Sequence, residues 1–418
     1  MPRHTIKERV PGVSAVVVHG IGALCTCDPL LGAAPGVVHD AALVARDGVI
    51  VYAGPESGLR RSGIPREALE IHARGAAVLP GFVDAHTHIL WLGDRGEEYA
   101  QRASGATYEE IAAAGGGILA TVRATAAGSV DELAAAGRDR ARHMLANGTT
   151  TVEVKSGYGL EHEAEMRQLD AADRLREWED LPDVVATYLP LHAVPEGPRE
   201  AYVDDVCTRG VAGAAKRARF VDAFCETGAY TVDECERLFT AARAQGLRAK
   251  IHAEQRSNSG GALLAARAGA VSADHLEHAT NTDLEALSSA GVVGVILPGA
   301  SVVLGGPPPP GRRLLEAGCT VAVATDCNPG TCYSESMPLM LSLAVALAGL
   351  TPAQALVAAT AGGAAALGLA DRGILRAGLR CDAVILETPS WIDVAYHLGG
   401  DIVASVIHEG RLEVPSKT

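Results

Sequence analysis

The sequence has few aromatic residues, at 4%, no cluster of basic residues and no cysteine pair spaced as C-x-x-C. Its net charge is −14 and its Lys and Arg residues are scattered, so it offers no basic surface for nucleic acid. The nine cysteines are odd in number, and a disulfide framework is uncommon in a chain of this size, which favours a reducing compartment. The longest apolar stretch, 337–350, is shorter than the roughly 18 to 20 residues that a membrane span needs, and no signal-peptide core is present. We therefore expect a cytoplasmic protein that binds neither nucleic acid nor a membrane.

The central part of the chain alternates short apolar runs with alanine-rich stretches of helical character. This rhythm is typical of βα units that build a parallel sheet. Eight runs predict strands, and helices such as 161–178 and 232–244 separate several of them. The predicted strands are 77–83, 150–154, 184–189, 220–224, 248–252, 270–273, 294–297 and 320–324. An α/β fold with a (β/α)8 TIM-like barrel is the expected architecture, with catalytic loops at the carboxyl ends of the strands.

The two ends of the chain have a different texture, with short β-branched runs and tight turns. Asp47-Gly48 between two apolar runs is a strong hairpin signal, and 382–386, 402–407 and 412–414 predict further strands. Neither end is long enough for a core of its own, so we expect them to meet in one small β-sandwich. The predicted domains are 1–75 and 371–418 for the sandwich, and 76–370 for the barrel.

Histidines and an aspartate follow several of the predicted barrel strands. His86 and His88 lie two residues apart, and in extended backbone such side chains project to the same side. His252 ends the fifth strand and Asp326 follows the eighth, so three nitrogen ligands and one oxygen ligand would meet at the barrel mouth. That set suits Zn²⁺ or Fe²⁺, and such an ion lowers the pKa of bound water towards about 7.

Longer words in the sequence carry a resemblance to a known family. They are HTHILWLGDR, VEVKSGYGL, LHAVP, KIHAEQ, SADHLEH, ILPGA and ATDCNPGT, in this order within residues 75–400. Together they resemble the imidazolonepropionase family of the amidohydrolase superfamily. The resemblance implies a barrel with a split β-sandwich, a homodimer, and one divalent or trivalent metal ion per chain, Zn or Fe. It also implies hydrolysis of the cyclic amide of 4-imidazolone-5-propanoate to N-formimino-L-glutamate in histidine catabolism.

The resemblance assigns roles to particular residues. It implies that His86, His88, His252 and Asp326 bind the metal. Our hypothesis for the mechanism is that Asp326 also accepts the proton of the attacking water and that His275 steadies the developing oxyanion. The planar fork of Arg95 suits the substrate carboxylate. The other predicted substrate contacts are Tyr108, whose hydroxyl could act as a donor, and Tyr158, His192, Gln255, Asn328, Gly330 and Thr331. The Asn-Pro-Gly-Thr loop at 328–331 is also, more simply, strong turn chemistry.

Some positions depart from the family pattern, and other functions stay open. Gln255 stands where some members have Glu and cannot act as a base, so we expect it to hydrogen-bond the ring; Ala126 stands where an Arg is usual. Lys155 is expected to be unmodified, in a site with one metal. The closest alternative is a deaminase of a nucleobase or another cyclic amidine. A non-catalytic barrel scaffold would be expected to have lost a metal ligand, and none is missing.

Overall fold

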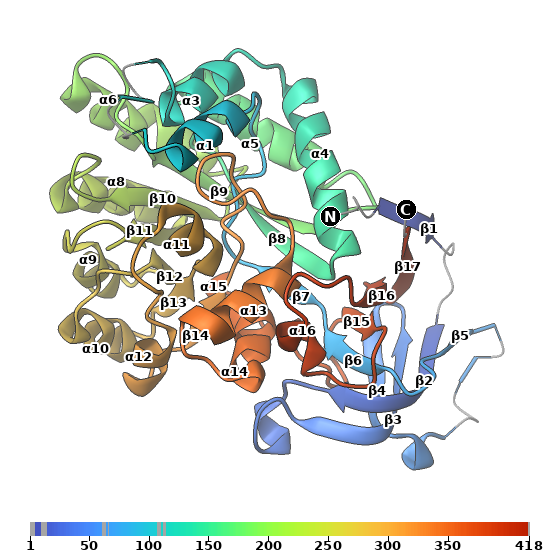
Figure 1. The fold of residues 1–418 in the computed structure, drawn as a ribbon. Coiled ribbons are helices and arrows are strands. Elements are labelled where there is room, and N and C mark those ends of the chain that lie inside the picture. Colours follow the sequence, from blue (N-terminus) through green and yellow to red (C-terminus); the bar gives the residue numbers. More distant parts are fainter. Residues whose placement is uncertain are drawn as a thin grey trace.

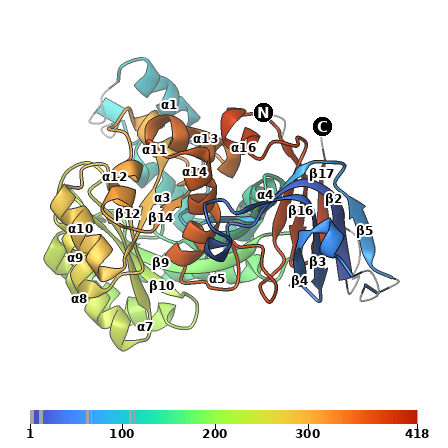
Figure 2. The same ribbon diagram turned by 90° about the horizontal axis from the view of Figure 1, so that it is seen from below.

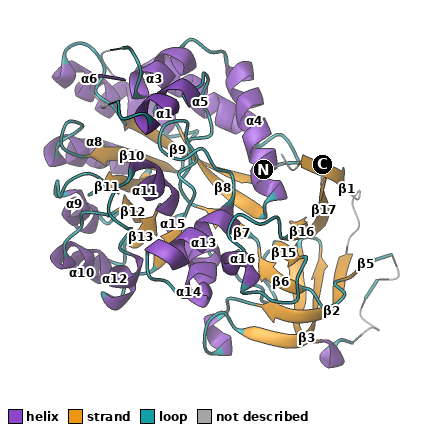
Figure 3. Ribbon diagram, viewed as in Figure 1, coloured by secondary structure: helices purple, strands orange, loops and turns teal. Residues whose placement is uncertain are grey.

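A computed structural model describes residues 5–9, 15–60, 64–65, 67–106, 110–111 and 114–416. Its strands form two separate sheets, one of eight strands and one of nine, with helices packed around the first (Figures 1 and 3). The predicted substrate contact Tyr108 lies outside the described residues. No helix within the described ranges is long and apolar enough to cross a membrane.

The eight-stranded sheet is parallel and nearly closed, and it confirms the predicted barrel. Neighbouring strands follow one another in chain order from β7 to β14, as βα units require. The strands are β7 (Phe82–Asp84), β8 (Thr149–Lys155), β9 (Asp183–Leu191), β10 (Phe220–Cys225), β11 (Arg248–Ala253), β12 (Ser272–His275), β13 (Val293–Ile296) and β14 (Val321–Val323).

Helices connect these strands and cover the outside of the barrel (Figure 2). Three helices follow β7: α1 (Gly96–Ala103), α3 (Ile118–Ala126) and α4 (Val130–Ala146). The next six strands are followed by α5 (His162–Leu175), α6 (Arg199–Asp205), α7 (Val211–Ala214), α8 (Val232–Ala244), α9 (Gly261–Ala268), α10 (Asn281–Ala290), α11 (Pro298–Leu304) and α12 (Gly311–Glu316). After β14 the chain forms α13 (Met337–Leu347), α14 (Pro352–Val357), α15 (Gly363–Ala366) and α16 (Asp393–Tyr396). The predicted helix 232–244 is α8.

The nine-stranded sheet joins the two ends of the chain. Its strands are β1 (Thr5–Arg9), β2 (Ala15–Cys25), β3 (Val37–Arg46), β4 (Val49–Pro55), β5 (Leu69–His72), β6 (Ala77–Pro80), β15 (Ala383–Leu386), β16 (Val403–His408) and β17 (Arg411–Ser416). The predicted hairpin turn is present between β3 and β4, with φ of +48° at Asp47 and +77° at Gly48. One hydrophobic cluster gathers buried side chains of both ends, among them Val16, Leu43 and Ile385.

The predicted strand 77–83 is wrong as a single strand, because the chain divides at Gly81 between the two sheets. Residues before it form β6, which pairs with β15 and β2, and residues after it form β7 of the barrel. A Cβ atom at Gly81 would lie 2.3 Å from the hydroxyl oxygen of Thr150, so only glycine lets the chain pass this close to β8. Pro80-Gly81 interrupts the apolar run in the sequence, and the structure shows that the two halves belong to different sheets.

The barrel closes between its first and last strands just beyond their carboxyl ends. The amide of Asp326 donates to the carbonyl of His86, and the amide of His88 donates to the carbonyl of Cys327, both at 3.0 Å. Deeper in the seam, the amide and the hydroxyl of Thr325 both donate to the buried carboxylate of Asp84. The closure of the barrel therefore fixes His86, His88 and Asp326 against one another.

Candidate active site

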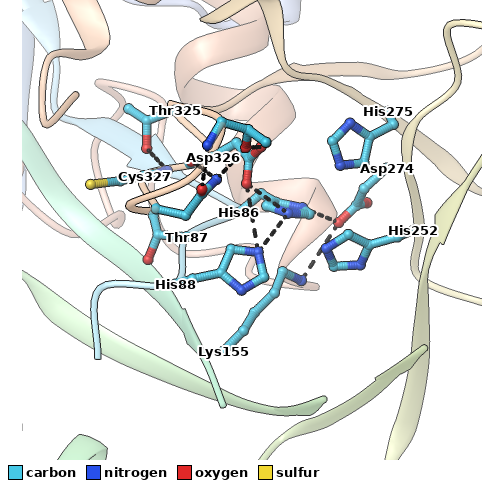
Figure 4. Close-up of polar contacts among 12 residues, drawn as sticks. His86, Thr87, His88, Lys155, His252, Asp274, His275, Thr325, Asp326 and Cys327 are labelled. Carbon is cyan, nitrogen blue, oxygen red and sulfur yellow. Dashed lines mark hydrogen bonds and ion pairs between the residues drawn. The ribbon is translucent and has the colours of Figure 1, made fainter. Parts of the chain in front are cut away.

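Three of the four predicted metal ligands meet at this seam, and the fourth lies beside them. Nε2 of His86 lies 3.3 Å from Nε2 of His88, and Oδ1 of Asp326 lies 3.5 Å from the first and 3.6 Å from the second. The ring of His252, on β11, lies 4.5 Å from that of His86 between centroids. All four side chains point into one space (Figure 4) and are almost fully buried.

This arrangement fits one metal ion. Ligand atoms that bind a tetrahedral zinc at about 2.0–2.1 Å lie about 3.4 Å apart, close to the spacing of these nitrogen and oxygen atoms. Burial lowers the pKa of both His86 and His88 well below 6.5, so both imidazoles are neutral and can bind a cation. Nε2 of His252 is buried and has no hydrogen-bond partner among the described residues. Nδ1 of His86 donates to Asp274 at 2.7 Å, which leaves the lone pair of Nε2 directed to the shared space.

Asp326 is held by the loop that follows it. The hydroxyl of Thr331 donates to Oδ2 of Asp326 at 3.2 Å, which leaves Oδ1 facing the histidines. The amide group of Asn328 binds inside its own loop: its nitrogen donates to the carbonyl of Asp326, and its oxygen accepts from the amides of Gly330 and Thr331. The loop is thus an Asn-capped turn that orients Asp326, and direct substrate contacts from Asn328 and Thr331 stay predictions.

His275 lies on the opposite side of the same space, at the end of β12 (Figure 4). Its ring centroid is 5.6 Å from that of His86 and 5.5 Å from that of His252. Burial lowers the pKa of His275, but the carboxylate of Glu277 outweighs it, so the net direction is upward. Its backbone has φ of +80°, a conformation that residues other than glycine rarely adopt. The position of the ring is compatible with the role predicted for His275 in steadying an oxyanion, and that role stays a prediction.

Two of the predicted ring-binding residues line the space next to His88. The ring of His192 stacks on that of His88 with centroids 5.0 Å apart, and Tyr158 lies 5.3 Å from His192. Nδ1 of His192 donates to the carbonyl of Gly157 at 2.9 Å, so its Nε2 is an acceptor. Burial lowers the pKa of His192 to about 3, so this ring is neutral. Gln255 is partly buried in the loop after His252.

The predicted carboxylate-binding residue, Arg95, lies against the loop that carries Asp326. Its Nε donates to Glu98 at 2.9 Å, and its Nη2 also contacts that carboxylate. Its third nitrogen, Nη1, lies where a side chain at position 330 would be, so it faces Gly330. Glu98 in turn accepts from the amide of Gly117 at 2.8 Å, which anchors the pair. The structure therefore brings Arg95 and the 328–331 loop together as the sequence predicts.

Sequence reasoning missed a group of buried ionisable residues beneath the histidines. They are Glu153, Asp222 and Lys250, together with Lys155 and Asp274, whose contacts it did not foresee; all five are fully buried. Their positions inside strands expected to be buried could have revealed them, since an isolated charge in such a place needs a partner.

A family model named the amidohydrolase family matches residues 77–412 of this chain. Imidazolonepropionase from Symbiobacterium thermophilum is 48% identical over 387 residues, which cover 90% of this chain and 91% of that protein. Imidazolonepropionase from Deinococcus radiodurans is 45% identical over 407 residues, 95% of this chain and 99% of that one. The chain belongs to the imidazolonepropionase family of amidohydrolases. This confirms the resemblance seen in the sequence.

Solved structures of more distant proteins share the fold. An adenosine deaminase from Xanthomonas campestris with bound zinc superimposes with a TM-score of 0.72 at 19% identity, over 96% of this chain and 92% of that one. This likeness supports the barrel with its additional sheet. The family and the fit of the His and Asp cluster together support a divalent metal ion at this site.

Proposed function

We propose that this chain hydrolyses the cyclic amide of 4-imidazolone-5-propanoate to N-formimino-L-glutamate, a step of histidine catabolism. The observation that carries the proposal is the position of Arg95, whose guanidinium lies at Gly330, in the loop whose Thr331 binds Asp326. One side of the site thus offers Nη1 of Arg95, the guanidinium nitrogen that does not bind Glu98, for a propionate group. The other side offers ligands for a metal beside the reacting ring. Relatives that carry the imidazolonepropionase name over nine-tenths of this chain support the same substrate.

The metal would be held by His86, His88, His252 and Asp326, with Zn and Fe both compatible with three nitrogen donors and one oxygen donor. Bound there, it would supply Lewis acidity and lower the pKa of water to near neutrality. Lys155 stays unmodified in this proposal. Burial lowers its pKa, but the carboxylates of Asp222, Glu153 and Asp274 outweigh burial and raise it above the usual range. A protonated amine has no lone pair with which to become carboxylated.

Side chains of the protein carry out the other steps of the reaction. Asp326 accepts a proton from the attacking water through a carboxylate oxygen, and the water oxygen bonds to the ring carbonyl carbon. His275, facing this carbon from the other side, donates to the developing oxyanion. The bond between the carbonyl carbon and the ring nitrogen breaks, and the proton passes from Asp326 to that nitrogen. Arg95 holds the propionate, while His192, Tyr158 and Gln255 bind the ring, and Tyr108 is retained as a predicted contact.

The alternative enzyme is a deaminase of a nucleobase or another cyclic amidine, which would use the same metal ligands. The two reactions differ in their products, because ring opening adds water without releasing ammonia and deamination releases one ammonia per turnover. Freshly prepared 4-imidazolone-5-propanoate and a panel of cyclic amidines should be offered to the same preparation, with ammonia and N-formimino-L-glutamate measured. Ammonia release from an amidine, with no turnover of the imidazolone, would contradict the proposal.

We also infer a homodimer, from the family alone. The expected cytoplasmic location, and the expected lack of nucleic-acid and membrane partners, stay predictions.

A further inference from the structure

Five charged side chains form a connected cluster at the base of the proposed metal site. Nζ of Lys155 lies 2.7 Å from Asp222, 2.9 Å from Glu153 and 3.6 Å from Asp274. Nζ of Lys250 lies 2.7 Å from the same oxygen of Glu153 and donates to the carbonyl of Ala85. The cluster therefore draws on four of the eight barrel strands, β8, β10, β11 and β12, and all five side chains are fully buried.

A cluster of buried charges does not by itself stabilise the core of a barrel. Removing each charge from water costs several kcal/mol, and well-packed apolar residues in place of a buried ion pair are often as stable or more stable. The rest of the barrel core consists mainly of apolar side chains. The cluster is therefore better explained by the groups it contacts than by the stability of the fold.

The groups it contacts are two of the metal-binding histidines. Oδ2 of Asp274 accepts from Nδ1 of His86 at 2.7 Å, and Oδ2 of Asp222 lies 3.1 Å from Nδ1 of His252. Asp274 thus lies behind the ring of His86, and a carboxylate in this position fixes the orientation and tautomer of a ligating histidine. Asp222 lies close to the ring of His252 without a hydrogen bond to its Nδ1, so it acts on that ring through its charge and its packing. The ammonium of Lys155 lies between the two carboxylates (Figure 4, where the line to Asp274 is drawn).

We propose that Lys155 is a positioning residue of the metal site, which holds Asp222 and Asp274 in place behind His252 and His86. Without its ammonium, two carboxylates from neighbouring parts of the barrel would repel each other across a dry space. They would then separate and turn the two imidazoles away from the geometry that one ion requires. Lys250 also binds Glu153, but its Nζ lies farther from Asp274 than that of Lys155, at 3.9 Å.

This inference rests on the metal site of the proposed function, but its test measures metal binding and not turnover, so the two can fail separately. Apoprotein of Lys155→Met should bind Zn²⁺, measured by competition with a chromophoric chelator, about 10- to 100-fold more weakly than the native chain. The Co²⁺ complex should show a changed visible spectrum, because the ligand geometry changes. Lys216→Met is the matched control, since Lys216 is exposed, and should leave both readouts unchanged.

A merely structural role gives a different result. In that case Lys155→Met would lower the melting temperature of the apoprotein while the Zn²⁺ affinity and the Co²⁺ spectrum of the folded fraction stay native, and the inference would be overturned. If Lys155→Met does not fold, Asp222→Asn keeps the shape of the side chain and removes the charge that Lys155 binds. That variant should weaken Zn²⁺ binding over the same range, and native affinity in it would also overturn the inference.

Discussion

A Cβ atom on Gly330 would lie 2.2 Å from Nη1 of Arg95. The guanidinium has little room to move away, because its Nε and Nη2 are both bound to Glu98. The absence of a side chain at position 330 is therefore what allows Arg95 to lie beside the loop of Asp326. The backbone of Gly330 has no left-handed φ, so alanine is compatible with the loop itself.

Gly330→Ala should weaken binding of the substrate carboxylate by displacing Arg95. A hydrogen bond to a charged group is worth about 1.5–3 kcal/mol, so we expect KM to rise about 10- to 100-fold with a smaller change in kcat. Steady-state kinetics on 4-imidazolone-5-propanoate measures both. Gly306→Ala is the control, since a Cβ there would contact nothing within 4 Å. An unchanged KM in Gly330→Ala would show that Arg95 does not bind the propionate.

Asp326→Asn should remove the proton acceptor while keeping the shape of the side chain. General-base catalysis typically raises the rate about 10²- to 10⁴-fold, so we expect kcat to fall by about that factor or more. The metal content per chain should be counted in the same preparation, because the carboxylate is also a proposed ligand. Asp131→Asn, in which the altered side chain is 80% exposed, serves as the control. A kcat within threefold of the native value would exclude Asp326 from the reaction.

Asp183 joins the barrel to the C-terminal part of the chain. Its carboxylate accepts from Arg372 at 2.6 Å and from Arg380 at 3.0 Å, and it lies 3.3 Å from His408. Burial raises the pKa of Asp183, but His408 and the two arginines outweigh burial, so the net direction is downward from 3.8. A carboxyl group whose pKa is lower in the folded protein than in the unfolded chain stabilises the fold at pH values above its unfolded pKa. This stabilisation is lost as the pH falls from the unfolded pKa through the folded pKa.

Asp183→Asn should therefore lower the free energy of unfolding at pH 7 by about 1.5–3 kcal/mol, the range for hydrogen bonds to a charged group. The difference between native and variant proteins should shrink progressively as the pH falls below about 4. Urea unfolding at a series of pH values measures it. A difference that stays constant from pH 7 to pH 3 would contradict the assignment of this charge.

The barrel could be predicted from the sequence because its strands are apolar runs set between alanine-rich helices. The meeting of His86, His88, His252 and Asp326 could be predicted for the same reason, since each lies at or just after the end of a strand and all such ends meet at one mouth. Pro80-Gly81 marks a break between two apolar runs, but the assignment of these runs to different sheets could not be predicted, because it depends on strands that lie far along the chain.

The contacts within the charged cluster, and the pairing of Arg95 with Glu98, also could not be predicted from the sequence. Lys155 and Asp222 are 67 residues apart, and His86 and Asp274 are 188 apart, so no local pattern joins them. The hydrogen bonds of the Asn328 amide within its own turn could not be predicted either, and its predicted substrate contact stays a prediction. A motif shows which residue types a site contains, whereas the hydrogen-bond and ion-pair partners of those residues depend on how the chain packs.

The most direct test is the loss of 4-imidazolone-5-propanoate, followed by its ultraviolet absorbance on freshly prepared substrate, with the metal of each enzyme preparation counted. We expect rapid loss of the substrate with one metal ion per chain, loss of activity on chelation, recovery on adding Zn²⁺ or Fe²⁺, and no activity in His86→Ala. Turnover that survives both chelation and His86→Ala would contradict it.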